Sequence, residues 1–240
     1  MSNADHPADR LSGTEASVQP LPTSFVRSRE AVHALAEHVL CTVRHAAVGR
    51  IGLTPVPDGI ATPPFDGRTV GLRGLDLVDS GPHGERRAPV TTLRAAGQFF
   101  GVDPVAPPLW TPTTTPDLDA PLAIEADDAA ALAAWFALVA GVLMRVDPSA
   151  AQTLWPEHFD LAITVGEVTF GGSPGDAEHA EPYLYVLPPA GFERGDPTFW
   201  NEPFGASLAY HRIDGQADAD TFFAEAAERL AAADPQESSS

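Results

Sequence analysis

The feature that most constrains the fold is a run of sixteen residues without a polar side chain, from Ala129 to Met144. A membrane-spanning helix needs about 20 such residues, and nearly half of this run is alanine. Asp127 and Asp128 precede the run and predict its N-cap, and Arg145 follows it. The run therefore predicts a buried core helix, which the rest of the chain must surround with apolar surface. Its bulky side chains recur at helical spacing: Leu132, Trp135, Phe136, Val139 and Leu143.

Hydrophobic spacing predicts the other elements on either side of this run. Apolar residues at i, i+3 and i+4 predict helices over residues 29–47 and 89–100, and Asp218 or Asp220 is expected to cap a final helix. At Gly166 the alternation of apolar residues changes parity, which predicts a bulge or a tight turn. Alternating or continuous apolar runs predict strands, and these cover residues 50–55, 70–78, 159–165, 183–187 and 206–213.

Residues 102–121, called here the Pro-rich segment, carry six prolines and little periodicity. The segment is too long for an ordinary connector and separates two halves, about residues 21–101 and 122–234. Each half has the order helix, strands, helix. We therefore expect a single α+β domain over residues 21–234, with antiparallel sheets covered by helices and two similar halves.

The charge balance argues against several partners and locations. The chain has 14 basic and 33 acidic side chains, a net charge of -19 and one cysteine. Such a surface repels phosphate backbones and anionic lipids, so we expect neither a nucleic-acid partner nor a membrane. One cysteine permits no internal disulfide, and residues 1–20 lack the pattern of a signal peptide, so we expect a cytoplasmic location. Residues 1–20 and 235–240 are expected to be disordered tails.

Three strings are prominent between Trp155 and Gly205: WPEHFDLA, SPGDAEHAEPYLYV and FWNEPFG. They resemble strings of an uncharacterised family of conserved proteins from high-GC bacteria. The resemblance implies no activity, cofactor or substrate. Function must therefore be argued from the residues themselves.

Aromatic and amide side chains in this part of the chain predict a pocket for a small molecule, because such pockets combine aromatic walls with a few polar groups. Carboxylates outnumber the single Arg194 between Glu157 and Glu202, so the ligand is expected to be a cation or a neutral polar molecule. The alternative is that these aromatic side chains belong to the core. The predicted ligand-binding residues are Tyr183, Tyr185, Trp200 and Asn201, and Phe199 and Phe204 would extend the wall.

Carboxylates and imidazoles in the same part of the chain suggest a second hypothesis, a metal-dependent hydrolase. Oxygen and imidazole ligands suit a metal ion, and here they fall in two sets. A straight strand would hold the two sets far apart, so joint ligation requires the chain to fold back near Gly166. The alternative is that the acidic side chains are simply solvated. The candidate metal ligands are His158, Asp160, Asp176, His179 and Glu181.

Two further patterns carry less weight. The string around Ser173 fits the nucleophile elbow G-x-S-x-G, but Pro174 lacks the N–H that an oxyanion hole needs. On the first predicted helix, His38, Cys41 and His45 lie on the face opposite the apolar stripe, where a second packing face that buries Cys41 is favoured over a metal site.

The leading hypothesis is thus a soluble, acidic, cytoplasmic protein that binds a small polar or cationic molecule. A metal-dependent hydrolase and a structural or interaction protein without catalysis are the alternatives. The sequence names no catalytic residue and no cofactor.

Overall fold

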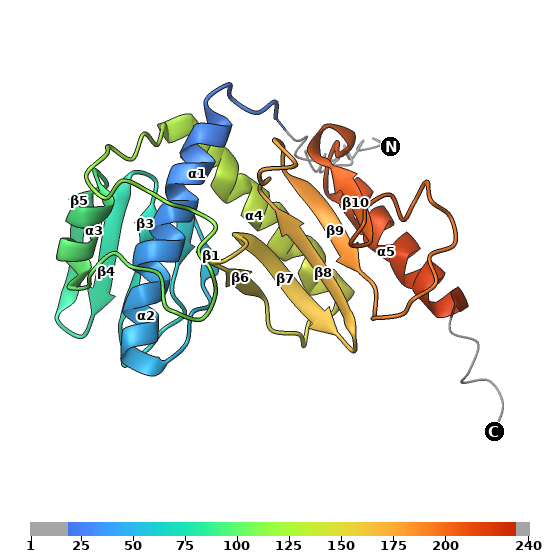
Figure 1. The fold of residues 1–240 in the computed structure, drawn as a ribbon, viewed down its shortest axis with the longest axis horizontal. Helices are drawn as coiled ribbons and strands as arrows, with labels where there is room; N and C mark the ends of the chain where they lie inside the picture. The colour runs from blue at the N-terminus through green and yellow to red at the C-terminus, as the bar shows by residue number, and fades with distance from the viewer. Residues whose placement is uncertain (1–18, 234–240) are drawn as a thin grey trace, which may run out of the picture.

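The computed structural model describes residues 19–233, and over them helices pack on two five-stranded antiparallel sheets (Figure 1). The expected α+β class, with antiparallel sheets covered by helices, is confirmed. Both sheets have their strands in chain order, and both halves have the order helix, strands, helix. Of the two predicted tails, all but residues 19 and 20 lie outside the described residues.

The first half begins with one long helix in three segments. A π-helical turn, η1 (Ala36–Leu40), interrupts it between α1 (Phe25–Leu35) and α2 (Cys41–Val48). The sheet follows, and then α3 (Leu93–Phe100). The five strands are β1 (Thr54–Val56), β2 (Gly59–Ala61), β3 (Thr69–Arg73), β4 (Asp76–Gly81) and β5 (Gly84–Pro89).

The second half begins with α4 (Ala126–Val146), and it ends with a 3-10 turn, η2 (Tyr210–Arg212), and α5 (Gln216–Ala233). Its five strands are β6 (Thr153–Trp155), β7 (Asp160–Val165), β8 (Val168–Ser173), β9 (Tyr183–Leu187) and β10 (Ala206–Ala209). The Pro-rich segment between the halves contains neither a helix nor a strand.

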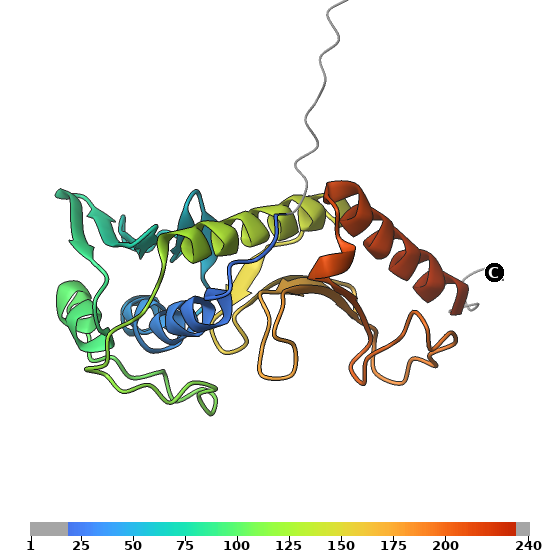
Figure 2. The ribbon, with the colours of Figure 1, turned by 90° about the horizontal axis from the view of Figure 1, so that it is seen from above.

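The two sheets lie side by side, with β1 and β6 at the junction (Figure 1). Leu53 and Leu154 form an isolated antiparallel bridge there, with N–O distances of 2.8 and 3.0 Å. Figure 2 shows α4 along one face of the second sheet. The Pro-rich segment and the loops after β6, β8 and β9 lie on the opposite side. That side of the second sheet is therefore bordered by loops and by α1.

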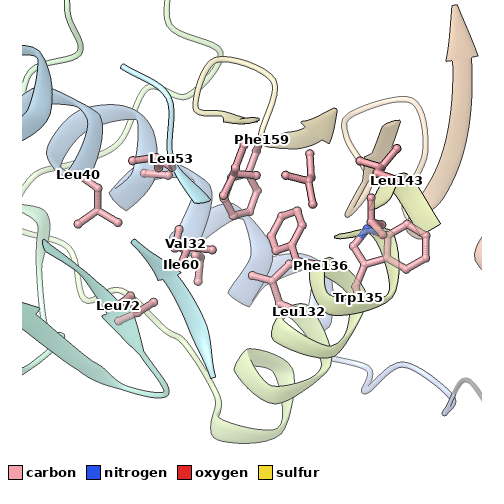
Figure 3. Packing of buried hydrophobic residues seen from close by; sticks show 14 of the residues in the cluster. Val32, Leu40, Leu53, Ile60, Leu72, Leu132, Trp135, Phe136, Leu143 and Phe159 are labelled. Atoms are coloured by element: carbon pink, nitrogen blue, oxygen red, sulfur yellow. The ribbon is translucent and has the colours of Figure 1, made fainter. Parts of the chain in front are cut away.

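Both halves contribute to one hydrophobic cluster. Figure 3 shows Val32 of α1, Phe136 of α4 and Phe159 facing one another at the junction. The rings of Phe136 and Phe159 meet edge to face, with centroids 5.5 Å apart. Burial of these side chains from both halves removes a continuous apolar surface from water, which is the main force holding the halves together.

Helix α4 has the apolar stripe that its sequence predicts: Leu132, Trp135, Phe136, Val139 and Leu143 are all buried. Small alanines, among them Ala130, Ala134 and Ala137, occupy its exposed side. Within residues 19–233 it is the one helix whose length and composition would allow it to cross a membrane, a test that core helices of soluble proteins also pass. Its N-cap is Glu125, not Asp127 or Asp128, which lie in the first turn.

Several predicted boundaries were wrong, each for a local reason. The predicted strand 70–78 is two strands, because Gly74 has a φ of 55° and turns the chain between Arg73 and Asp76. The predicted helix 89–100 begins only at Leu93, because Thr92 caps it by accepting a hydrogen bond from the Ala95 N–H (3.1 Å).

The start of the last helix also differs from the sequence prediction. Helix α5 begins at Gln216, so neither Asp218 nor Asp220 is its cap. The turn predicted at Gly166 is confirmed, because Gly166 has a φ of 61° and joins the paired residues Val165 and Val168.

Candidate functional site

A pocket of about 930 Å³, called here the main pocket, lies against the second sheet. Strands β7, β8 and β9 form its floor, α1 forms one wall, and the end of the Pro-rich segment with the residues just after it forms another. Pockets of several hundred Å³ are typical of small-molecule sites. The main pocket takes residues from both halves of the chain.

Strand register decides which side chains reach the floor. Asp160 begins β7, Ser173 pairs with Tyr183, and Gly171 pairs with Tyr185. Side chains alternate between the faces of a sheet, so Asp160, Ser173, Tyr183 and Tyr185 share the pocket face. The intervening residues face the core under α4: Leu161, Ile163, Phe170, Leu184 and Val186 are buried in the hydrophobic cluster.

Tyr185 crosses the neighbouring strand to reach Asp160. Its hydroxyl donates a hydrogen bond to Oδ2 of Asp160, two strands away. The ring passes over Gly171, where a Cβ atom would stand 2.5 Å from Cζ and Oη of Tyr185. The absence of a side chain at Gly171 therefore permits the contact between Tyr185 and Asp160.

Asp160 is a buried carboxylate, and one of its oxygens accepts no hydrogen bond from the described residues. Its exposed fraction is 7%, and Oδ1 has no hydrogen-bond partner within residues 19–233. Burial raises the pKa of Asp160, although the Tyr185 hydrogen bond and the nearby His158 act in the opposite direction. A buried acceptor without a donor is costly, so the ionised form of Asp160 lowers the stability of the fold.

A chain of polar side chains begins beside the floor. The Tyr183 hydroxyl donates to Oδ2 of Asp176 (2.7 Å), and Oδ1 of Asp176 lies 3.3 Å from Nδ1 of His179. Nε2 of His179 lies 3.1 Å from Oε1 of Glu202. Desolvation lowers the pKa of His179, but the two carboxylates outweigh it and the net shift is upward. The chain ends at a smaller pocket of about 540 Å³ that His179 and Glu202 line.

Arg29 of α1 holds the loop that follows β8. It is buried, with an exposed fraction of 5%, and its guanidinium donates to the backbone oxygens of Ala180 (3.2 Å) and Asp176 (3.4 Å). Oε1 of Glu30 is 3.5 Å from the same group. Arg29 is thus a buried cation that ties α1 to the loop after β8.

Glu37 fixes the Pro-rich segment against the long helix. This carboxylate is fully buried and accepts hydrogen bonds from Nε1 of Trp110 (2.9 Å), from the Thr113 N–H (2.9 Å) and from the Thr114 N–H and hydroxyl (3.0 and 2.6 Å). Desolvation opposes its charge, but these donors outweigh it and lower the pKa of Glu37. Glu37 lies in the π-helical turn, a local irregularity often found at functional sites.

His33 lines the main pocket as a neutral side chain. Its ring stacks on Phe159 with centroids 5.0 Å apart, and Nε2 donates to the carbonyl of Pro156 (2.9 Å). Burial lowers the pKa of His33 to about 4. It therefore contributes no positive charge to the main pocket at neutral pH.

The predicted ligand-binding residues divide into two groups. Tyr183 and Tyr185 line the main pocket, together with Phe204. Trp200 does not: its exposed fraction is 6%, and its ring packs in the core against Phe192 and Phe199, so the prediction for Trp200 was wrong. Aromatic composition alone cannot say which face of a fold a ring occupies.

Asn201 also lies outside the main pocket. It lines the smaller pocket, where its Oδ1 accepts from the Ser207 N–H (2.8 Å) and its amide donates to the Ser207 carbonyl (3.2 Å). These bonds hold the turn that leads into β10.

The five candidate metal ligands do not come together as one set. His158, Asp160 and Asp176 line the main pocket, whereas His179 and Glu181 line the smaller one. Among residues 19–233, no group of three or more His, Cys, Asp or Glu side chains could hold a metal ion. The chain does fold back at Gly166, but β8 runs on to Ser173 before the loop begins, and Asp176 then turns towards Tyr183.

The other two sequence patterns have structural explanations. Ser173 accepts a hydrogen bond from the Gly175 N–H (3.1 Å), and a loop follows it in place of the helix that a nucleophile elbow needs. Cys41 is fully buried and donates to the Glu37 carbonyl, and burial raises its pKa to about 12. His38 donates to the Thr114 hydroxyl (2.8 Å). The interpretation of this helix face as a second packing face is confirmed for Cys41.

The chain matches no family model, and comparisons with curated proteins and with solved structures found no significant similarity. The resemblance of the three strings to a bacterial family therefore stays a prediction.

Sequence reasoning missed two residues that shape the main pocket: Arg29 and Glu37. In the sequence, Arg29 and Glu37 look like the solvated side of an amphipathic helix. The one available signal was the Pro-rich segment itself, which lacks regular backbone pairing and so needs side chains elsewhere to satisfy its N–H groups.

Proposed function

We propose that this protein binds a small polar or cationic organic molecule in the main pocket. The observation that carries the proposal is the lining of the main pocket, which places five carboxylates beside an aromatic wall: Glu30, Asp117, Glu157, Asp160 and Asp176. A ligand with a positive charge or with hydrogen-bond donors would pair with them. Tyr183, Tyr185 and Phe204 supply the aromatic wall on which the rest of the molecule would pack.

Steric blocking of the main pocket tests the proposal. Ala31 of α1 lines the pocket, so Ala31→Phe should fill part of it. Ala47 is exposed on α2 of the same long helix, so Ala47→Phe is the matched control. We expect compounds from a library of polar and amine metabolites to raise the melting temperature of the native protein and of Ala47→Phe, but not that of Ala31→Phe. Equal shifts for all three proteins, or no shift with any compound, would contradict it.

The hydrolase hypothesis receives no such support, because its five ligand residues fall in two separate pockets. Within residues 19–233, no specific observation favours the interaction hypothesis over the pocket. The large exposed apolar side chains there are Val26, Val48, Leu75, Val105, Leu109, Met144 and Trp155.

A further inference from the structure

His179 joins two loops beside the main pocket. It belongs to the β8–β9 loop, residues 174–182, which walls the pocket through Asp176 and its two neighbours. One ring nitrogen, Nδ1, lies 3.3 Å from Oδ1 of Asp176 in the same loop. The other, Nε2, lies 3.1 Å from Oε1 of Glu202 in the β9–β10 connection. His179 thus ties a wall of the main pocket to the connection that leads into β10.

These two contacts require a proton on both ring nitrogens. An ionised carboxylate only accepts hydrogen bonds, and a neutral imidazole has a single N–H. A neutral His179 would therefore turn a lone pair towards either Asp176 or Glu202. The imidazolium form satisfies both carboxylates, and its charge also lies against the ring of Tyr183, with centroids 4.6 Å apart. The geometry thus fits the charged form, in agreement with the raised pKa of His179.

The other charged groups nearby do not replace His179 at these carboxylates. Arg29 of α1 donates to the backbone oxygen of Asp176 (3.4 Å), and Arg194 of the β9–β10 connection donates to that of Glu202 (3.0 Å). Ser207 of β10 donates its hydroxyl to Oε1 of Glu202 (3.0 Å) but brings no charge. In η2 and the β8–β9 loop, Nδ1 of His211 lies 2.6 Å from Glu181. The charged or titratable side chains that line the smaller pocket with His179 are Glu178, Glu181, Tyr183, Glu202, His211 and Arg212.

We propose that His179 is a pH-sensitive clasp: its imidazolium form holds the β8–β9 loop against the β9–β10 connection, and loss of its proton loosens this wall of the main pocket. The clasp needs no ligand, whereas its effect on binding rests on the proposed function. The folded protein holds the proton more tightly than the unfolded chain does. The clasp is therefore complete below the ordinary pKa of 6.5 and is lost as the pH rises through the higher pKa of the folded protein.

Nuclear magnetic resonance of the ligand-free full chain tests the charge on His179. We expect its imidazole signal, which is absent from His179→Gln, to titrate with a midpoint above 6.5. Glu202→Gln should lower this midpoint, because it removes a carboxylate that favours the imidazolium. Glu167→Gln makes the same change in charge at the exposed turn between β7 and β8 and should leave the midpoint unchanged.

Solvent exchange of backbone N–H groups in the same samples tests the loop. The N–H of Asp176 donates to the His179 carbonyl (2.8 Å), and that of Glu178 donates to Oδ1 of Asp176 (2.8 Å). At pH 6 both should exchange about ten-fold more slowly in the native protein than in His179→Gln, as one charge-assisted hydrogen bond is worth. At pH 9 the two proteins should exchange alike, because glutamine resembles the neutral form in having one donor group and no charge.

The outcomes separate the clasp from the proposed function. A midpoint for His179 at or below 6.5, or equal exchange of the native protein and His179→Gln at pH 6, overturns the clasp whether or not a ligand binds. If no compound of the metabolite library binds, the proposed function is overturned, and the two ligand-free measurements still decide on the clasp. Should His179→Gln not fold, as judged by circular dichroism, the midpoints of the native protein and of Glu202→Gln decide.

Binding gives the last readout. The library compound with the largest melting shift should bind about three-fold more weakly to His179→Gln than to the native protein at pH 6, and equally at pH 9. Equal affinities at pH 6 would overturn the role of the clasp in the main pocket.

Discussion

Asp160 and Glu37 are both buried carboxylates, but their hydrogen bonds differ. Glu37 accepts from Trp110, Thr113 and Thr114, and its pKa is lowered despite burial. The Asp160 carboxylate accepts a side-chain hydrogen bond from Tyr185 alone, and its pKa is raised. Glu37 therefore stabilises the fold above its unfolded pKa and loses that contribution as the pH falls, whereas the charge on Asp160 destabilises the fold as the pH rises.

We predict that Asp160→Asn raises the stability of the ligand-free protein at neutral pH. The folded protein holds the Asp160 proton more tightly than the unfolded chain does, so its stability falls as the pH rises above the ordinary value of 3.8. Asparagine removes the charge and still accepts from Tyr185. Thermal melts from pH 4 to pH 8 should show a gain that grows with pH and reaches about 2–4 °C, or ~1 kcal/mol. A loss of stability, or a gain shared by Glu167→Gln, would refute it.

Among the helices and strands, the sequence predicted those features that follow from the spacing of apolar residues. The stripe of α4 and the exact limits of β9 follow from apolar spacing. The boundary between β3 and β4 was missed because apolar residues continue on both sides of Gly74, so composition hides the turn. Tyr183 and Tyr185 were correctly placed at a pocket, but Trp200 was not, because only the strand register says which rings share a face with Asp160.

The close approach of the Tyr185 ring to Gly171 of β8 leads to a prediction about this sheet. Gly171→Ala should push the Tyr185 ring away from Asp160, because the new Cβ would stand 2.5 Å from that ring. We expect a loss of about 1–3 kcal/mol in unfolding free energy, measured in urea, and weaker binding of any main-pocket ligand.

Gly166→Ala is the matched control for this change. It strains a backbone with a φ of 61° in open space, so it should cost stability but not binding. A Gly171→Ala protein that binds as tightly as Gly166→Ala would show that the position of Tyr185 does not matter.

The molecule as a whole has two halves of similar element order but one hydrophobic cluster. The main pocket depends on this sharing, because α1 comes from the first half and the sheet floor from the second. Hydrophobic periodicity within each half could not predict the pocket, since packing between halves is set by long-range contacts. Val32, Phe136 and Phe159 make such contacts at the junction (Figure 3).

A shared core predicts a single cooperative unfolding transition. Trp110 reports on the Pro-rich segment, and Trp135 and Trp200 report on the second half. Urea curves followed by tryptophan fluorescence and by far-ultraviolet circular dichroism should therefore have the same midpoint. Phe136→Ala should lower both midpoints together, at a cost of about 3–5 kcal/mol. Two separated transitions would show that the halves fold independently.

The bridge between Leu53 and Leu154 has a mechanical consequence. Ladders of several hydrogen bonds fix the angle between neighbouring strands, whereas a single bridged pair does little to fix the angle between the two sheets. The relative orientation of the two sheets therefore depends on side-chain packing, and α4 supplies much of it because it contacts β1 and β2 of one sheet and β7 and β8 of the other. Because the main pocket is walled by α1 from the first half and floored by the second sheet, that packing also sets the shape of the pocket.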